Sequence, residues 1–344
     1  MACRFTVREI GFSILSQDIY TVAVIDDNAD AKDPQWTTFH NKNKDCNLRL
    51  EVLNPSLDEQ HPILISARQN GIKFPCNILV APDGRLFQLE DSGMEKIYAE
   101  ILETPLGRKL RTTFPDVFAA VVWVEGKDAD KNLLFEAKIN EVCKTIENLM
   151  PAMPKIVKNG PVSIAVSKQD FREERILLWS LGIDAQPEEP IAIVLYGRGR
   201  KIGELLNQKE IQEGTLFNYL SMIGADCECG LDKKWMLGNQ VPLLWDHKLR
   251  QKLTDQVDFD VDNPLILAEM SRILAKESLS DQTGSVAFAP ETVDLEEAFG
   301  APVENNPKKT PEKNNTRPVN VLIFTVIGLV LFVLIIGSAI YIRK

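Results

Sequence analysis

Two cysteines separated by one residue are the sharpest chemical feature of the sequence. Cys227 and Cys229 lie in the stretch DCECG at positions 226–230. Two thiols this close together can form a strained disulfide, exchange disulfides as thiolates, or bind a soft metal ion. A structural zinc site needs about four ligands, and the nearest further donor along the chain is His247. We therefore interpret the pair as a structural turn and keep thiol chemistry as the alternative, with metal binding the least favoured.

A glycine-rich basic stretch, YGRGRKIG at positions 196–203, is the second candidate site. Glycines let backbone amides approach a phosphate, and arginines can pair with it. The dinucleotide-binding pattern, however, needs glycine where Ile202 stands, and the Gly-Lys-Ser/Thr of a P-loop is absent. The stretch is therefore predicted to be a hairpin turn with an exposed basic tip, which could meet an acidic partner or lipid headgroups. We expect no cofactor.

The elements that position these residues include an internal repeat. The segment PCNILVAPDGR at 75–85 recurs as PIAIVLYGRGR at 190–200, an offset of 115 residues. At the same offset, strand-like residues 47–54 align with residues 162–169. Solenoid repeats are about 20 to 50 residues long, so this longer period indicates two duplicated domains.

Each copy is predicted to alternate strands and helices. In the first copy residues 20–25 form the opening strand, whereas residues 26–45 are polar and their helix is uncertain. The second copy has clearer periodicity and a glycine, Gly182, that ends its second helix. The predicted elements of the second copy are strands at 118–125, 162–166 and 191–196 and helices at 133–149 and 171–181.

This order of elements, with a proline directly before a strand and a glycine turn into the next strand, resembles the thioredoxin-like fold. The resemblance covers residues 20–102 and 118–220. It implies a cis peptide bond before the proline of each copy and a hairpin that closes each sheet. The residues that define the fold under this resemblance are Pro75, Gly84, Arg85, Pro190, Gly199 and Arg200.

The two copies depart from active thioredoxins at the start of the first helix. Active members place Cys-x-x-Cys there, where the helix N-terminus lowers the pKa of the thiol. Here the corresponding residues are DDNAD at 26–30 and GKDAD at 126–130, which cannot exchange disulfides. The resemblance therefore implies redox-inactive domains that serve as binding modules.

The C-terminal region predicts attachment to a membrane. The 22 residues from Val321 to Ile342 carry no charge. A helix of that length can cross about 30 Å of hydrocarbon. A polar stretch rich in Ser, Asn, Pro, Glu and Lys precedes it and is typical of a flexible linker. The basic residues of that stretch favour a cytoplasmic side for the body of the protein, although Arg343 and Lys344 beyond the apolar run weaken the contrast. The four basic residues are Lys308, Lys309, Lys313 and Arg317.

The overall composition limits the kinds of partner that the protein is expected to bind. The chain has 344 residues, 44% apolar content and a formal net charge of −10, so it contains enough apolar residues for cores and is too acidic to favour nucleic acid. We expect a single-pass membrane protein that contacts the lipid bilayer through residues 321–342 and binds a protein partner, such as a membrane complex.

The sequence thus predicts an α/β protein built of two tandem three-layer thioredoxin-like domains. The predicted parts are a first domain at 1–112, a second at 113–225, an extension at 226–277 with an amphipathic helix at 264–276, a disordered linker at 278–318 and a transmembrane anchor at 319–344. The favoured function is a membrane-tethered adapter or scaffold without catalysis. The alternative is a membrane-anchored thiol-disulfide oxidoreductase that uses Cys227 and Cys229.

Overall fold

The structure is a computed structural model that describes residues 4–13, 18–28, 45–90, 93–225, 238–257 and 259–277. These described residues all fall in one compact unit. The strands are β1 (Tyr20–Ile25), β2 (Leu48–Leu53), β3 (Cys76–Val80), β4 (Leu86–Gln88), β5 (Ala120–Val124), β6 (Val162–Val166), β7 (Ile191–Tyr196) and β8 (Arg200–Leu206). The α-helices are α1 (Val7–Gly11), α3 (Pro62–Gln69), α4 (Met94–Leu102), α5 (Pro105–Thr113), α6 (Ala129–Leu149), α7 (Arg175–Ser180), α8 (Gln208–Gln212), α9 (Thr215–Gly224), α11 (His247–Val257) and α12 (Pro264–Glu277).

The first sheet has four strands in the order β2-β1-β3-β4. β1 pairs in parallel with β2, while β3 runs antiparallel to both β1 and β4. Successive side chains of a strand point to opposite faces, so Val22 packs on one face of the sheet with α4, and Ala23 packs on the other with α3. α3 begins at Pro62, which suits the first position of a helix because its missing N–H would have no partner there.

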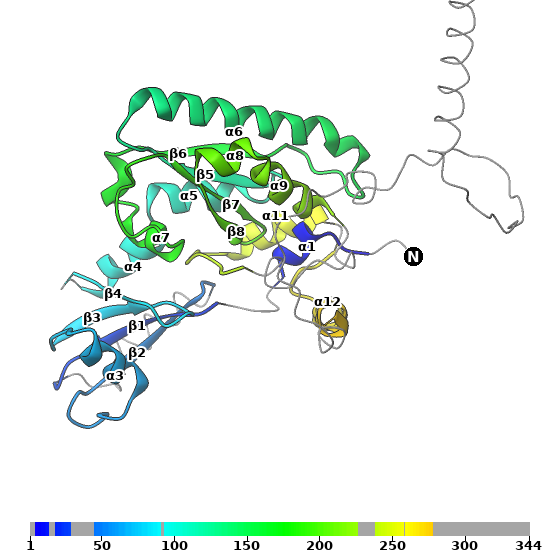
Figure 1. Cartoon of the computed structure of the whole chain (residues 1–344). Coiled ribbons are helices and arrows are strands. Elements are labelled where there is room, and N and C mark those ends of the chain that lie inside the picture. The colour runs from blue at the N-terminus through cyan, green and yellow to red at the C-terminus, as the bar shows by residue number, and fades with distance from the viewer. Residues whose placement is uncertain are drawn as a thin grey trace, which may run out of the picture. The chain divides into compact units, whose positions relative to one another are not determined.

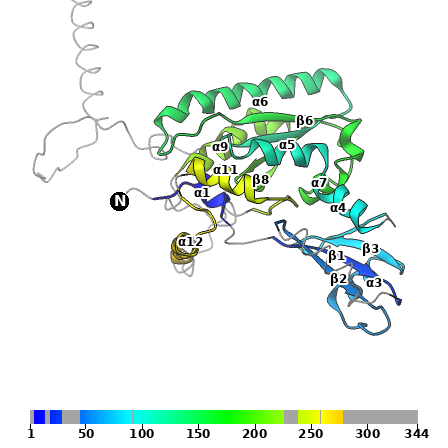
Figure 2. The same cartoon turned by 180° about the vertical axis from the view of Figure 1, so that it is seen from behind.

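The second sheet repeats the same arrangement in the order β6-β5-β7-β8. β5 is parallel to β6 and antiparallel to β7, which is antiparallel to β8. Val121 and Trp123 contribute to the core under α6 and α9, whereas Val122 and Val124 contribute to the core under α5, α7 and α11. Figure 1 and Figure 2 show helices on the two sides of this sheet, seen from opposite directions. The domain therefore has three layers.

A parallel pair followed by an antiparallel hairpin, in this strand order, is the arrangement of the thioredoxin-like fold, and both sheets have it. The cis peptide bond predicted before Pro75 is confirmed. The same prediction at Pro190 is wrong, since the described Glu189–Pro190 bond is not cis. Trans is the more stable isomer of an X-Pro bond by about 0.5–1 kcal/mol, and a proline before a strand does not by itself select cis. Gly84 and Gly199 have φ values of +86° and +78°, which glycine adopts without strain.

The helices differ from their predicted bounds for local reasons. α6 begins at Ala129, four residues before the predicted start, because the Asp128 carboxylate accepts hydrogen bonds from the amides of Asp130 and Lys131 and so caps the helix. The helix predicted at 171–181 is instead a short 3₁₀ turn at Asp170–Arg172 followed by α7. The amphipathic helix predicted at 264–276 is confirmed as α12.

The N-terminal segment and the extension pack on the second sheet. Phe5, Val7 and Ile10 are buried in the core beside α6 and α9. α1 starts with a capping box, in which Thr6 and Glu9 bond to each other's backbone amides. On the other face of the sheet, the extension contributes Trp245 to the core under α5. The second sheet is thus covered by segments from distant parts of the chain.

Arg85, in the hairpin of the first sheet, contacts the end of α7 in the second copy. Its guanidinium donates hydrogen bonds to the carbonyl oxygens of Trp179 (2.8 Å) and Ser180 (3.4 Å) and lies 5.0 Å from the Trp179 ring centroid. The last carbonyl groups of a helix carry partial negative charge and have no partner within the helix, so a cation is favourable there. Trp179 and Ile176 also share a buried apolar cluster with Tyr20 and Leu79 of the first sheet.

We expect Arg85→Ala to lower the free energy of unfolding by about 1–2 kcal/mol, because it removes both charge-assisted hydrogen bonds and the ring contact from a partly exposed site. Denaturant unfolding of the full-length chain in mild detergent measures this loss. Lys209→Ala serves as the control, since Lys209 is exposed and paired on α8, and it should change stability by less than about 0.5 kcal/mol. Equal effects of the two substitutions would show that Arg85 does not hold the two sheets together.

Candidate functional site

The start of α6 is the position at which the thioredoxin resemblance places a catalytic thiol. Asp128 occupies the N-cap position, and its carboxylate accepts the hydrogen bonds that cap the helix. The Asn132 side chain accepts a hydrogen bond from the Gly126 amide (2.8 Å) and donates one to the Gly126 carbonyl (3.1 Å). Each polar group here is used in positioning the backbone, and none of these side chains is a nucleophile for disulfides.

This helix start is also packed directly against the segment before β7. A Cβ atom placed on Gly126 would lie 2.6 Å from the carbonyl carbon of Glu189 and from the nitrogen of Pro190, so no larger residue fits without moving backbone. The Lys127 amide donates a hydrogen bond to the Glu188 carbonyl at 2.9 Å. The backbone of residues 126–127 is thus fixed against the segment before β7.

Two exposed ion pairs flank the same contact. The Lys127 ammonium lies 2.6 Å from a Glu188 carboxylate oxygen, and the Lys131 ammonium lies 2.5 Å from one of Glu189. The Glu189 carboxylate raises the pKa of Lys131 by accepting its hydrogen bond. Exposed pairs contribute little to stability individually because water screens them, so their main effect is to orient the two segments.

In the first copy the corresponding residues follow β1. Asp26 accepts a hydrogen bond from the Asn28 amide, and the Asp27 carboxylate accepts one from the Ser56 hydroxyl at 2.7 Å. Residues 29 and 30, which complete the predicted DDNAD stretch, lie outside the described residues, as does the helix region up to residue 44. Cys76 follows the cis proline, and burial raises the pKa of its thiol, which disfavours the reactive thiolate.

The prediction of an exposed basic tip at the second hairpin is wrong. Arg200 has an exposed fraction of 0% and Arg198 of 6%. The extension covers the turn, because the Val241 amide bonds to the Gly199 carbonyl and the Gln240 side chain bonds to the Arg198 carbonyl. Burial lowers the pKa of Arg198 to about 10. Sequence reasoning missed this burial because the residues that cover the hairpin are about 40 positions away.

Arg198 is held between an aromatic ring and a carboxylate. Its guanidinium lies 5.3 Å from the Trp245 ring centroid and 3.8 Å from an Asp262 carboxylate oxygen. Burial also lowers the pKa of Arg200, while the nearby Tyr196 and Asp18 act in the opposite direction. These arginines are therefore part of the core beneath the hairpin and are not available to lipid headgroups or an acidic partner.

The cysteine pair and the predicted anchor lie outside the described residues. Cys227 and Cys229 fall in the interval 226–237, and residues 321–342 fall in the interval 278–344. Within the described ranges, no helix combines the length and the apolar character needed to cross a membrane. The same ranges hold no cluster of three or more His, Cys, Asp or Glu side chains suited to a metal ion.

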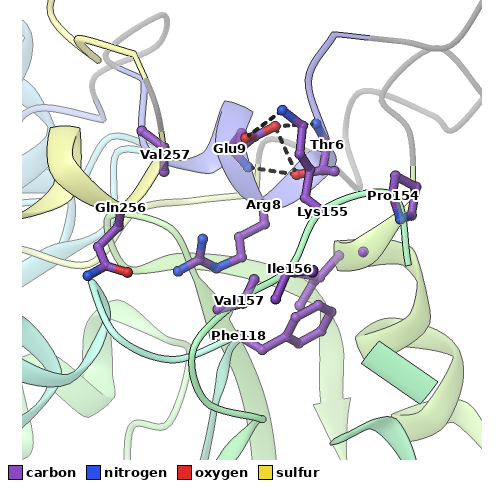
Figure 3. A pocket seen from close by; sticks show the side chains of 12 residues that line it. Thr6, Arg8, Glu9, Phe118, Pro154, Lys155, Ile156, Val157, Gln256 and Val257 are labelled. Carbon is purple, nitrogen blue, oxygen red and sulfur yellow. Dashed lines mark hydrogen bonds and ion pairs between the residues drawn. The ribbon is translucent and has the colours of Figure 1, made fainter. Parts of the chain in front are cut away.

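A cavity of about 250 Å³ lies where the N-terminal segment meets the second copy (Figure 3). Its apolar wall includes Phe118, Ile156 and Val157. Its charged residues come mainly from α1, which sequence reasoning did not single out. The Thr6-x-x-Glu9 capping-box pattern was the available signal for a helix start there, but it does not reveal a cavity. The full lining is Thr6, Arg8, Glu9, Phe118, Pro154, Lys155, Ile156, Val157, Ile223, Gly224, Gln256 and Val257.

Comparison with protein-family models finds no match, and comparison with curated proteins finds none either. Among solved structures, the first two thioredoxin domains of Eps1p from Naumovozyma dairenensis align with 56% of this chain and 85% of theirs, at 13% identity and a TM-score of 0.19. Those of Saccharomyces cerevisiae Eps1p align with 59% and 90%, at 10% identity and a TM-score of 0.21. The zinc-bound form of human ERp44 aligns over 64% of this chain and 59% of that chain, at 11% identity and a TM-score of 0.21.

These TM-scores are low, so the assignment of the fold rests on the order and direction of the strands in each sheet. On that basis each of the two sheets has the strand arrangement of the thioredoxin-like fold. The site at the start of α6 has the backbone arrangement of a capped helix and lacks the thiols of an oxidoreductase.

Proposed function

We propose that this protein is a membrane-tethered adapter without catalytic activity, which binds a protein partner through its thioredoxin-like domains. The observation that supports the proposal is the start of α6, where Gly126 packs on the Glu189–Pro190 peptide and Asp128 serves as the helix cap. Residues 126–130 of the second copy include no cysteine, so this position supplies no thiolate for disulfide exchange. A domain that has the thioredoxin-like arrangement of strands but a capping residue in place of the reactive thiol is suited to binding.

Residues 321–342 would supply the tether, with the body on the cytoplasmic side, and a membrane complex would be the natural partner of a protein fixed in that position. The exposed surface of α6 offers an apolar anchor for this partner. Leu133 and Leu134 are adjacent, and 64% and 66% of their surfaces are exposed. Exposed apolar side chains that lie together favour binding of another protein, because binding removes their surface from water.

Purification of the full-length protein from its native membrane in mild detergent tests the proposal. The control carries Cys227→Ser and Cys229→Ser together. We expect a stoichiometric partner with both forms, and no turnover of a small disulfide substrate by wild type above the rate of the control. Turnover by wild type that the double substitution abolishes would instead establish a thiol-disulfide oxidoreductase. A protein that is recovered alone would contradict the adapter.

We expect Leu133→Glu together with Leu134→Glu to reduce recovery of the partner at least tenfold, because two charges replace the apolar contact at the interface. Glutamate suits an exposed helical position, so folding should be preserved. Quantitative affinity purification measures the loss. The matched control is Leu57→Glu, which also replaces an exposed leucine but lies in the first copy. An equal loss with Leu57→Glu would show that the effect does not come from α6.

A further inference from the structure

The cavity between α1 and the second copy contains a buried cation that is hydrogen bonded to neutral groups. Arg8 has an exposed fraction of 5%, and its Nε and Nη2 atoms donate hydrogen bonds to the Val117 carbonyl at 3.1 and 2.9 Å. Nη2 also lies 3.4 Å from the Pro115 carbonyl. These bonds fix the direction of the guanidinium. The Phe12 ring centroid lies 4.9 Å from the guanidinium carbon, and the Glu9 charge favours the charged form of Arg8 and so raises its pKa, against the larger effect of burial. Among the described residues, however, no carboxylate forms an ion pair with this buried cation.

The nearest carboxylate is occupied by other groups. Glu9 accepts a hydrogen bond from the Thr6 amide at 2.8 Å, and its other oxygen lies 3.6 Å from the Lys155 ammonium. Figure 3 shows the Glu9 side chain turned toward Thr6, whereas the Arg8 side chain points away from both. With Arg8 and Lys155 against Glu9, the charged residues that line the cavity carry a net charge of about +1 at neutral pH.

The remaining wall of the cavity combines the polar side chains of Thr6 and Gln256 with apolar ones. Phe118, Ile223 and Val257 are buried, whereas Ile156 has an exposed fraction of 87% and so reaches into solvent. Pockets for drug-sized ligands measure about 300–1,000 Å³, and this cavity, at about 250 Å³, suits something smaller. Two cationic groups, Arg8 and Lys155, beside apolar side chains complement a molecule with one anionic end and a short apolar body.

We propose that this cavity binds a small carboxylate that carries an apolar group, with its carboxylate at Arg8 and Lys155 and its apolar part against Phe118, Val157 and Ile223. The bound anion supplies the negative charge that the buried guanidinium otherwise lacks. Because the Arg8 hydrogen bonds join α1 to residues 115–117, such a ligand also stabilises the docking of the N-terminal segment on the second copy.

Calorimetric titration of the full-length chain in a non-ionic detergent tests the site, with hexanoate as the probe. Hexanamide has nearly the same shape without the charge, and acetate has the charge without the apolar body. We expect hexanoate to bind, and hexanamide and acetate each to bind at least tenfold more weakly. Equal affinities for hexanoate and hexanamide, or no binding of hexanoate, would overturn the proposal.

Two substitutions test whether hexanoate binds in this cavity. Arg8→Met should abolish hexanoate binding, although it also removes hydrogen bonds that support the fold. Ile156→Glu does not share that drawback, because the Ile156 side chain is exposed. It adds a negative charge at the cavity, so hexanoate affinity should fall at least fivefold while the thermal unfolding of the ligand-free protein is unchanged. An unchanged affinity in Ile156→Glu would show that hexanoate binds elsewhere.

Discussion

Replacing Gly197 by alanine is expected to lower the free energy of unfolding by about 3–5 kcal/mol, the largest effect of any single methyl group we identify. Gly197 has a φ of +57°, where an L side chain is strained. Its new Cβ atom would also overlap the backbone carbonyl of Gly11. Because both atoms of that carbonyl are backbone, α1 would have to move away from the second hairpin and break the hydrogen bond from the Arg198 amide to the Gly11 oxygen.

Gly84→Ala is the matched control for this substitution. Gly84 lies in the hairpin of the first copy and has a φ of +86°, and a Cβ atom placed on it would meet no atom of the described residues within 4 Å. It therefore reports backbone strain alone, about 1–2 kcal/mol. Denaturant unfolding of the two variants in the same detergent gives the difference between their losses of stability. That difference measures the contribution of the packing of α1 against the hairpin. If both variants lose the same stability, the close approach of Gly11 to the hairpin is not present in solution.

Trp245→Ala should lower the free energy of unfolding by about 3–5 kcal/mol. Trp245 is 2% exposed and packs edge-on against Phe12 and stacked against Phe114, with ring centroids 6.4 and 6.5 Å apart. Together with other apolar residues of the extension, such as Leu243 and Leu253, it packs against Phe12 and residues of α5 in one core cluster. Its removal also takes the aromatic face from the buried guanidinium of Arg198, which then lies beside a cavity.

Trp245→Phe separates the loss of packing volume from the loss of the aromatic ring, since phenylalanine keeps a ring and most of the volume. We expect this variant to lower the free energy of unfolding by about 1–2 kcal/mol. Thermal and denaturant unfolding both measure the series. An alanine variant that is as stable as the phenylalanine variant would mean that the extension does not contribute to the core of the second copy.

The elements that the sequence predicted well are those with strong local patterns. β1, β6 and β7 have the predicted bounds, because each is a short apolar or β-branched run with a clear end. The 115-residue repeat correctly indicated two sheets of the same topology. The pattern of a strand depends on neighbouring residues, and the repeat depends on two segments that align with each other. Both can therefore be read from a single sequence.

What the sequence did not reveal depends on contacts between distant segments. Arg198 and Arg200 have the composition of a solvent-exposed turn, but residues 239–245 of the extension, among other distant segments, cover them. Arg8 was not recognised as part of a site, because its partners lie more than 100 positions away at residues 115–117. The trans bond at Pro190 likewise follows from its surroundings rather than from the Pro-strand pattern that it shares with Pro75.

Residues near the N-terminus form contacts with residues that are synthesised much later. The Tyr20 hydroxyl donates its hydrogen bond to the Gln240 carbonyl, 220 positions later. At about 5–20 residues per second, that partner is made roughly 10–45 s after Tyr20. Throughout this interval the apolar side chains of Phe5, Val7 and Ile10 have no finished core to enter. Residues 5–10 are thus among the last of the described residues to reach their native contacts.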